Sequence, residues 1–184
     1  MNVLNDILDK CRKNDRNAQA ELYKALAPKL LGLCLRYMQD RDEAEDVMQD
    51  SFVKIFMNLG SYKGEGSFEG WAKRIAANTA LNALKKKNRI WFERDLSVVE
   101  HTDDVPEEVH TEITMEQLMS CLQLLPPGYR TIINLFLVEE FSHKDIAERL
   151  SISESTSRSQ YTRARQALIK LIKERQTVKG SKYA

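Results

Sequence analysis

The chain has 184 residues, a formal net charge of +1, four Pro and seven Gly, which fits a helical soluble protein of one domain or two small ones. Its three cysteines are far apart and lack a CxxC spacing, so they predict neither a disulfide framework nor a zinc site but small core residues: Cys11, Cys34 and Cys121. No stretch has the roughly 18 apolar residues of a membrane span, and the first residues lack a signal-like apolar run. We therefore expect a cytoplasmic protein without membrane insertion.

The charges are segregated along the chain. The segment Trp71 to Arg89 carries six basic residues and no acid, and Ser142 to Ala184 carries ten bases against four acids, a net charge of +6. Between them, Glu93 to Glu116 holds nine acids against Arg94 alone, a net charge of −8. Basic segments neutralise phosphates, so both are candidates for nucleic-acid binding, and the acidic stretch can mask them in the free chain.

In the first third of the chain, apolar residues at helical spacing predict helices over about residues 3–11 and 18–38. Pro28 leaves open whether the second segment is one kinked helix or two helices meeting near Ala27. Asp40, with Glu43 three residues later, is a capping-box arrangement that starts the next helix. That helix has a wide apolar face and an opposite face with Asp46, Gln49, Asp50 and Val53. The second face suits either solvent or docking on a basic partner.

A glycine-rich stretch, Gly60 to Gly70, predicts a loop whose backbone can take positive φ. Its aromatic residues, Tyr62 and Phe68, could bracket an unstacked base, although a plain connector would look the same. We expect Ser67 to cap the basic helix that follows. One stripe of that helix gathers an indole, amides and cations, opposite a stripe of alanines: Trp71, Arg74, Asn78, Asn82, Lys85 and Arg89. The alternative is a solvated basic face with the indole in the core.

The helical pattern fails over residues 93–112, which are acidic and contain Pro106, so we interpret them as an interdomain linker. Helices are predicted again over 113–124 and from Pro127 to about Leu137, the latter apolar almost all round. Serines that can cap two further helices, Ser142 and Ser153, complete a helix-turn-helix pattern. The outer face of its second helix could read a major groove, or be the polar side of a helical hairpin: Arg158, Ser159, Thr162, Arg163 and Gln166.

The order of these parts resembles the bacterial sigma factors of the extracytoplasmic-function group, across about residues 3–175. The matching stretches are DRDEAEDVMQDSFVKIF, then SFEGWAKRIAANTALNALKKKNR, an acidic linker, and LPPGYRTIINLFLVEEFSHKDIAERLSISESTSRSQYTRARQAL. The resemblance implies an all-α chain with a region 2 domain at 1–92, a linker at 93–112, a region 4 domain at 113–175 and a basic tail at 176–184. It implies a transcription initiation factor, not an enzyme, with no cofactor and no metal.

The resemblance also implies roles for particular residues. Polymerase docking, on the clamp helices of the β′ subunit, would fall to Asp46, Gln49 and Asp50. Opening of the minus-ten promoter element and capture of a flipped non-template base would fall to the loop 60–67 and to Trp71, Arg74, Asn78, Asn82 and Lys85. Reading of the duplex minus-thirty-five element would fall to Arg158, Ser159, Thr162 and Arg163. Residues 124–137 would lie near the flap of the β subunit, and an anti-sigma partner is common in this family.

A different function remains possible from the residues alone. A helix-turn-helix regulator that binds duplex DNA as a dimer, without becoming a polymerase subunit, would explain Ser142 to Leu171. It would leave the first ninety residues unexplained. An enzyme acting on nucleic acid would need a catalytic constellation, and we find no nucleotide-binding GxxxxGK[ST], no HExxH and no triad in the sequence.

Overall fold

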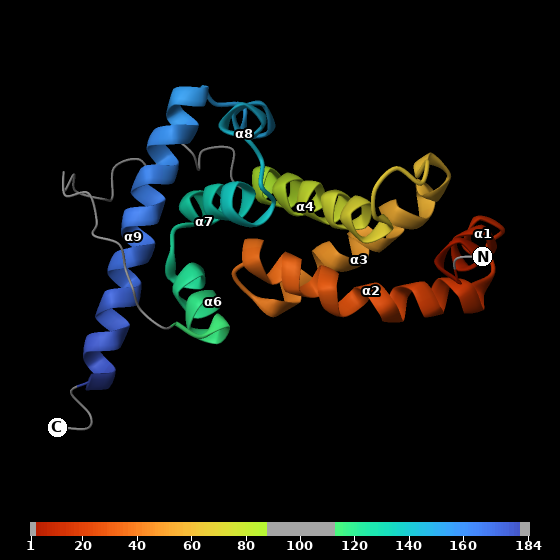
Figure 1. The fold of residues 1–184 in the computed structure, drawn as a ribbon, viewed down its shortest axis with the longest axis horizontal. Helices are drawn as coiled ribbons and strands as arrows, with labels where there is room; N and C mark the ends of the chain where they lie inside the picture. The colour runs from red at the N-terminus through yellow and green to blue at the C-terminus, as the bar shows by residue number, and fades with distance from the viewer. Residues whose placement is uncertain (1–2, 88–112, 181–184) are drawn as a thin grey trace. The chain divides into compact units, whose positions relative to one another are not determined.

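The computed structural model describes residues 3–87 and 113–180 (Figure 1). Every regular element in these ranges is helical, which confirms the predicted all-α class for the part of the chain that is described. The chain separates into two compact units, Met1–Asn88 and Arg89–Ala184. The predicted linker, residues 93–112, lies outside the described residues, and the exact domain boundaries stay predictions.

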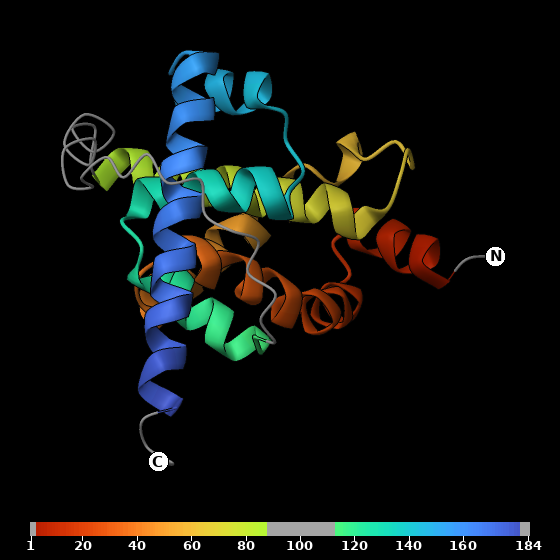
Figure 2. The same cartoon turned by 60° about the vertical axis from the view of Figure 1, so that its left-hand side comes forward.

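The first unit is built on three packed helices, α2 (Arg16–Tyr37), α3 (Arg41–Met57) and α4 (Phe68–Lys87), which lie side by side in both views (Figures 1 and 2). A shorter helix, α1 (Val3–Arg12), packs on α2, and a 3₁₀ turn, η1 (Leu59–Ser61), follows α3. The core lies between these helices. Its members recur at helical spacing, as the sequence pattern predicts, and include Leu22, Leu26, Leu30, Leu33, Ala44, Val47, Phe52 and Ile55.

Helix α2 runs unbroken through Pro28, so the alternative of two helices meeting near Ala27 is wrong. Pro28 removes one backbone donor, but Leu26 on one side of it and Leu30 on the other are both buried. Packing of this apolar stripe holds the helix together across the missing bond. The helix is capped by Asp15, whose carboxylate accepts from the backbone N–H groups of Asn17 and Ala18 at 2.9 and 3.0 Å.

The predicted caps of α3 and α4 are both present. The Asp40 carboxylate accepts from the Glu43 N–H at 2.7 Å, and the Ser67 hydroxyl accepts from the Gly70 N–H at 3.0 Å. The alanine stripe of α4 is fully buried at Ala72, Ala76 and Ala80, so small side chains let this helix approach α2 and α3 closely. Its opposite face is thereby turned outward.

The second unit contains α6 (Met115–Leu124), α7 (Pro127–Ile133), η3 (Asn134–Val138), α8 (His143–Leu150) and α9 (Glu154–Gly180). Helix α9 lies beside α6 and α7 in Figure 1 and passes across them in Figure 2, and it packs on both of them. The helix α6 begins with a complete capping box between Thr114 and Gln117. The core of this unit is formed by Cys121, Leu122, Leu125, Tyr129, Ile133, Ala164 and Leu168.

The apolar segment after Pro127 departs from the prediction of one central helix. It is α-helical to Ile133 and then widens into a π turn, η3. A π turn takes more residues per turn than an α-helix, so it rotates the side chains beyond it relative to the preceding face. Leu135 is fully buried, whereas Leu137 and Val138 are 52% and 46% exposed. The end of this apolar segment therefore lies at the surface and not in the core.

The helix-turn-helix is formed by α8 and α9. Ser142 and Asp145 make the predicted capping box of α8, Ser151 takes the left-handed conformation that ends it, and the Ser153 hydroxyl caps α9 by accepting from the Thr156 N–H at 3.0 Å. Ser157 and Ala164 face inward and are fully buried. The helix continues to Gly180, beyond its predicted end near Glu174.

All three cysteines are free and buried, which confirms them as small core residues. Burial disfavours the thiolate, and it raises the pKa of Cys34 to about 12. It also raises the pKa of Cys11, with the carboxylate of Asp15 adding to the effect. These thiols therefore pack as small apolar groups.

Candidate nucleic-acid and docking interfaces

The outward face of α3 carries the acidic residues that the sequence singles out. Asp46, Gln49 and Asp50 are exposed, and the Gln49 amide donates to the hydroxyl of Tyr23 at 3.1 Å. The same stripe continues with Val53 and Met57, which are 57% and 79% exposed. At about 100° per residue these five side chains fall within one third of the helix circumference. We call them the α3 face: an acidic half followed by an apolar half.

Sequence reasoning missed Met57 as part of this face. Its spacing was visible, because Met57 lies four residues after Val53 and seven after Asp50. An exposed Met at the end of an amphipathic helix is adaptable and apolar, which is typical of binding surfaces. The structure adds the deciding fact, which is its exposure.

The outward face of α4 is polar over most of its length. Arg74, Asn78 and Asn82 are exposed, whereas Trp71 and Lys85 are half-buried. The predicted choice between an exposed indole and a core indole therefore resolves to an intermediate state. The Trp71 ring contacts Tyr62 and Phe68 and stays partly accessible.

Part of this face borders a cavity of about 380 Å³. The predicted residues Trp71, Asn78 and Asn82 line it, and Arg74 and Lys85 do not belong to its lining among the described residues. The cavity is completed from α4, the end of α3 and η1 by Ile75, Thr79, Lys54, Asn58 and Ser61. Its size falls within the range of small-molecule sites, and its wall offers an indole, three amides and a cation.

Sequence reasoning missed four residues of this cavity: Ile75 and Thr79 of α4, and Lys54 and Asn58 at the end of α3. The Lys54 ammonium donates to the Thr79 hydroxyl at 3.1 Å, which holds it over α4. The Asn58 amide donates to the Lys54 carbonyl at 2.8 Å. The i, i+4 spacing of Lys54 and Asn58 near the end of α3 indicated that they share one helix face. Only the packing of α3 against α4 shows that they line the same cavity as Asn78.

The aromatic residues of the glycine loop pack on one another. The Tyr62 ring centroid lies 5.1 Å from that of Phe68 and 5.6 Å from that of Trp71, and Phe68 and Trp71 are 5.4 Å apart. Phe68 is only 2% exposed, so the expectation that it could bracket an unstacked base is wrong. It anchors the start of α4 in the core, and the two half-buried rings remain at the surface.

The outer face of α9 carries the four residues predicted to contact duplex DNA. Arg158, Ser159 and Thr162 are exposed and Arg163 is half-buried. The Arg158 guanidinium lies 2.5 Å from a carboxylate oxygen of Glu154, one turn earlier. The hydroxyls of Ser159 and Thr162 donate to backbone carbonyls at 3.0 and 3.1 Å, which leaves their oxygen lone pairs as acceptors.

The first residue of α8 ties the two helices of the helix-turn-helix together. The His143 ring stacks on Phe136 with centroids 4.5 Å apart, and its Nδ1 lies 3.0 Å from the Ser157 hydroxyl. Burial lowers the pKa of His143, and the nearby Arg158 guanidinium lowers it further against a smaller opposing effect of Glu154. The neutral imidazole is therefore the form that fits this site.

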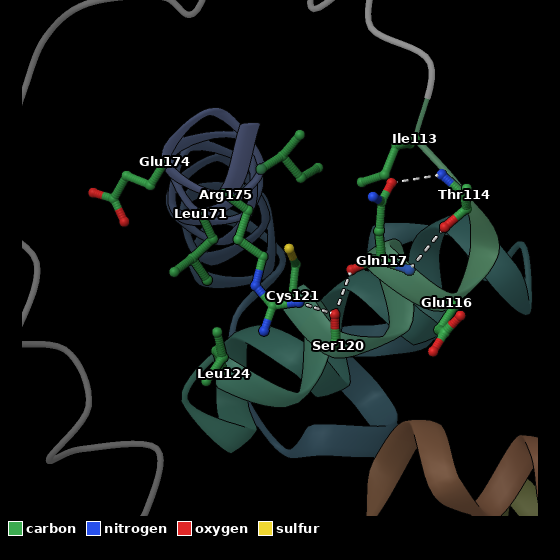
Figure 3. A pocket seen from close by; sticks show the side chains of 11 residues that line it. Ile113, Thr114, Glu116, Gln117, Ser120, Cys121, Leu124, Leu171, Glu174 and Arg175 are labelled. Atoms are coloured by element: carbon green, nitrogen blue, oxygen red, sulfur yellow. Dashed lines mark hydrogen bonds between the residues drawn. The ribbon is translucent and has the colours of Figure 1, made fainter. Parts of the chain in front are cut away.

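A second cavity, of about 790 Å³, lies between α6 and the late part of α9 (Figure 3). Arg175 points across it to the Ser120 hydroxyl, while Glu174 points away. Its walls are mostly apolar, with Leu124, Leu171 and Ile172 among them. It lies on a different part of α9 from the residues predicted to contact DNA, so it is not part of that face.

Comparison with known proteins places both units in one family. The Sigma-70 region 2 family model matches residues 22–90, and the Sigma-70 region 4 model matches residues 115–168. The RNA polymerase sigma-H factor of Pseudomonas aeruginosa is 32% identical over 180 residues, covering 90% of this chain and 92% of its own. The ECF RNA polymerase sigma-E factor of Haemophilus influenzae is 31% identical, covering 88% and 91%.

A solved structure shares the fold. The sigma factor RpoE of Bartonella quintana, crystallised with the anti-sigma factor NepR, superposes with a TM-score of 0.52 at 23% identity, covering 84% of this chain and 96% of its own. Two sigma-70 domains in this order define a sigma factor of RNA polymerase. The chain belongs to its extracytoplasmic-function group and is an alternative sigma factor, which the sequence predicts; the dimeric-regulator alternative is not supported.

Over residues 3–87 and 113–180, no helix combines the length and the apolar character that crossing a bilayer requires.

Proposed function

We propose that this sigma factor docks on core RNA polymerase through the α3 face, opens the minus-ten element with α4 and the adjoining loop, and reads the minus-thirty-five element with α9. The observation that carries the proposal is the cavity of the first unit. It brings Lys54 of α3 together with Trp71 and Asn78 of α4, a helix whose outward face also carries basic residues. Such a hollow can take a single base, and such a helix can bind the phosphates that flank it.

The α3 face supports docking on a partner that offers cations and apolar side chains. Its acidic half would pair with basic residues, for which we propose the clamp helices of the β′ subunit. Its apolar half, Val53 and Met57, would be buried at the same contact. In the second unit, the exposed apolar residues Leu124, Leu137 and Val138 support a contact with the flap of the β subunit.

Promoter opening needs a place where an extruded base is more stable than in the duplex. Unstacking a base costs a few kcal/mol, and stacking on an aromatic ring returns about 1–3 kcal/mol. The accessible part of Trp71 can provide the stacking surface, and the amides of Asn78 and Asn82 can bond to base edges. We propose that the non-template strand is held there, with the cations of Arg74 and Lys85 on its phosphates.

Upstream recognition falls to the outer face of α9. Arg158 and Arg163 can pair with guanine or phosphate, and Ser159 and Thr162 present acceptor oxygens beside them. The role as a whole requires no catalytic residue and no cofactor, because stabilising the open state is a matter of binding. We propose that the protein acts in the cytoplasm, where polymerase binds the chromosome. We also propose that an anti-sigma factor regulates it by covering the α3 face and the outward faces of α4 and α9.

The deciding experiment is promoter-dependent transcription with purified core polymerase. We expect wild type to initiate on a subset of a promoter library, and Asp46→Lys combined with Asp50→Lys to weaken core binding by at least about tenfold. The control is Asp6→Lys combined with Glu21→Lys, which reverses two exposed charges on other helices of the same unit. Intact core binding by the α3 variant would refute the docking surface, and wild type that initiates nowhere would refute the function.

A further inference from the structure

Helix α1 lies before the part of the chain that matches the region 2 family model, which begins at residue 22, yet it is bonded to the glycine loop. The Arg12 guanidinium donates to the Tyr62 carbonyl at 3.2 Å and pairs with the Asp9 carboxylate at 2.7 Å. The helix beneath it is anchored by Leu8 and Cys11, which are 1% and 3% exposed. Arg12 therefore acts from a packed helix and not from a loose terminus.

A second bond closes the loop on itself. The Tyr62 hydroxyl donates to the Gly66 carbonyl at 2.8 Å, so residues 62–66 form a ring through the tyrosine side chain. Gly64 and Gly66 have φ of +82° and +75°, which glycine adopts without strain. The Tyr62 ring also lies against Phe68 and Trp71. The loop is thus shaped before any ligand arrives.

The same loop adjoins the cavity wall. Ser61 lines the cavity and directly precedes Tyr62, and Trp71, which the Tyr62 ring contacts, lines it as well. A shift of the Tyr62 backbone or ring would move both of these wall residues. The two bonds to Tyr62 therefore hold a residue that adjoins two parts of the cavity wall.

We propose that Arg12 and the Tyr62 hydroxyl are positioning residues that determine how strongly the protein discriminates between bases of the minus-ten element. The inference rests on the proposed function, because it assigns the cavity to a base. A preorganised wall loses little freedom when the correct base binds and adapts poorly to a wrong one. Loss of the Arg12 or the Tyr62 hydroxyl hydrogen bond would make the cavity wall more mobile. The difference in binding free energy between the correct base and the other bases would then become smaller.

The test uses holoenzyme assembled from core polymerase and full-length protein. Promoters carrying each of the four bases at every minus-ten position are compared by their rates of open-complex formation. At one minus-ten position, we compare the rate of open-complex formation with the best base to the rates with the other three. For Arg12→Ala and for Tyr62→Phe, we expect this rate ratio to fall about two- to tenfold, which is the range of a single hydrogen bond. Core affinity and the effect of minus-thirty-five substitutions should stay as in wild type.

Matched variants separate positioning from general damage. Arg12→Lys keeps the charge and one donor and should restore part of the ratio, whereas Lys13→Ala removes a charge just past the end of α1 and should leave the ratio unchanged. Tyr62→Phe retains the ring packing and removes only the hydroxyl. Its base ratio therefore tests the proposal even if Arg12→Ala lowers the melting temperature. An equal loss on all four bases, or an unchanged ratio in both variants, overturns the proposal. Wild type that opens no promoter refutes the proposed function itself.

Discussion

Replacement of Arg158 tests the upstream interface in the most direct way. An arginine that reads a guanine contributes about 1–3 kcal/mol of discrimination. In the free protein the Arg158 guanidinium is paired with Glu154 at 2.5 Å, and releasing an exposed pair one turn apart on a helix costs about 0.3–0.5 kcal/mol. We therefore expect Arg158→Ala to weaken holoenzyme binding to its preferred upstream sequence by about 0.5–2.5 kcal/mol, or about two- to sixtyfold.

The assay is holoenzyme affinity for upstream duplexes in which each base pair is replaced in turn. Arg158→Ala should lose affinity only through one base pair, and at that position the variant should bind all four base pairs equally well. Glu154→Gln is the matched control: it frees Arg158 and removes an acid from the turn that we propose to face DNA, so binding should tighten. A uniform loss over all sequences, with the salt slope reduced by about one, would refute base reading and make Arg158 a phosphate contact.

Two further predictions concern the cavity and the helix-turn-helix. Lys54→Met should slow promoter opening, measured by permanganate reactivity of unpaired thymines, while core binding is unchanged; an equal effect of Lys24→Met, an exposed lysine of α2, would argue against a role of the cavity. Burial and Arg158 hold the pKa of His143 below its ordinary value of 6.5. As pH falls, the unfolded state therefore protonates His143 before the folded state does. The neutral His143 contributes its full share of the unfolding free energy above pH 6.5, and this share is lost as pH falls through the folded-state pKa. Chemical denaturation between pH 7 and 5 should show this decline, and His143→Gln should flatten it; an unchanged slope would contradict the assignment.

Features set by residues close in sequence were predictable. The caps at Asp40, Ser67, Ser142 and Ser153 each depend on a side chain and a backbone N–H three residues apart, so their geometry is contained in a short segment. The apolar stripes predicted the core for the same reason, since a helix places every third or fourth residue on one face. The outward placement of Asp46, Asn78 and Arg158 followed from that periodicity.

Features set by contacts between distant segments were not predictable. Phe68 looked like a loop aromatic because its neighbours are glycines, but it is buried under Tyr62 and Trp71. Pro28 left open whether the segment is one helix or two, because propensity does not include the packing of Leu26 and Leu30 around it. Val138 lies exposed at the end of a π turn, which the helical periodicity did not predict.

The sequence by itself therefore determined the family, the helical elements, their inward faces and the outward positions of most residues that we propose for docking and DNA contact. These depend on periodicity, on side-chain chemistry and on the order of motifs along the chain. The tertiary structure alone decided that Lys54 and Asn58 share a cavity with Asn78, that Met57 extends the α3 face, and that Arg12 is bonded to the glycine loop. The cavity and the Arg12 bond arise because close packing brings together residues separated by 20 to 50 positions, and such contacts leave no periodic trace in the sequence. The exposure of Met57 depends on which parts of α3 the other helices cover.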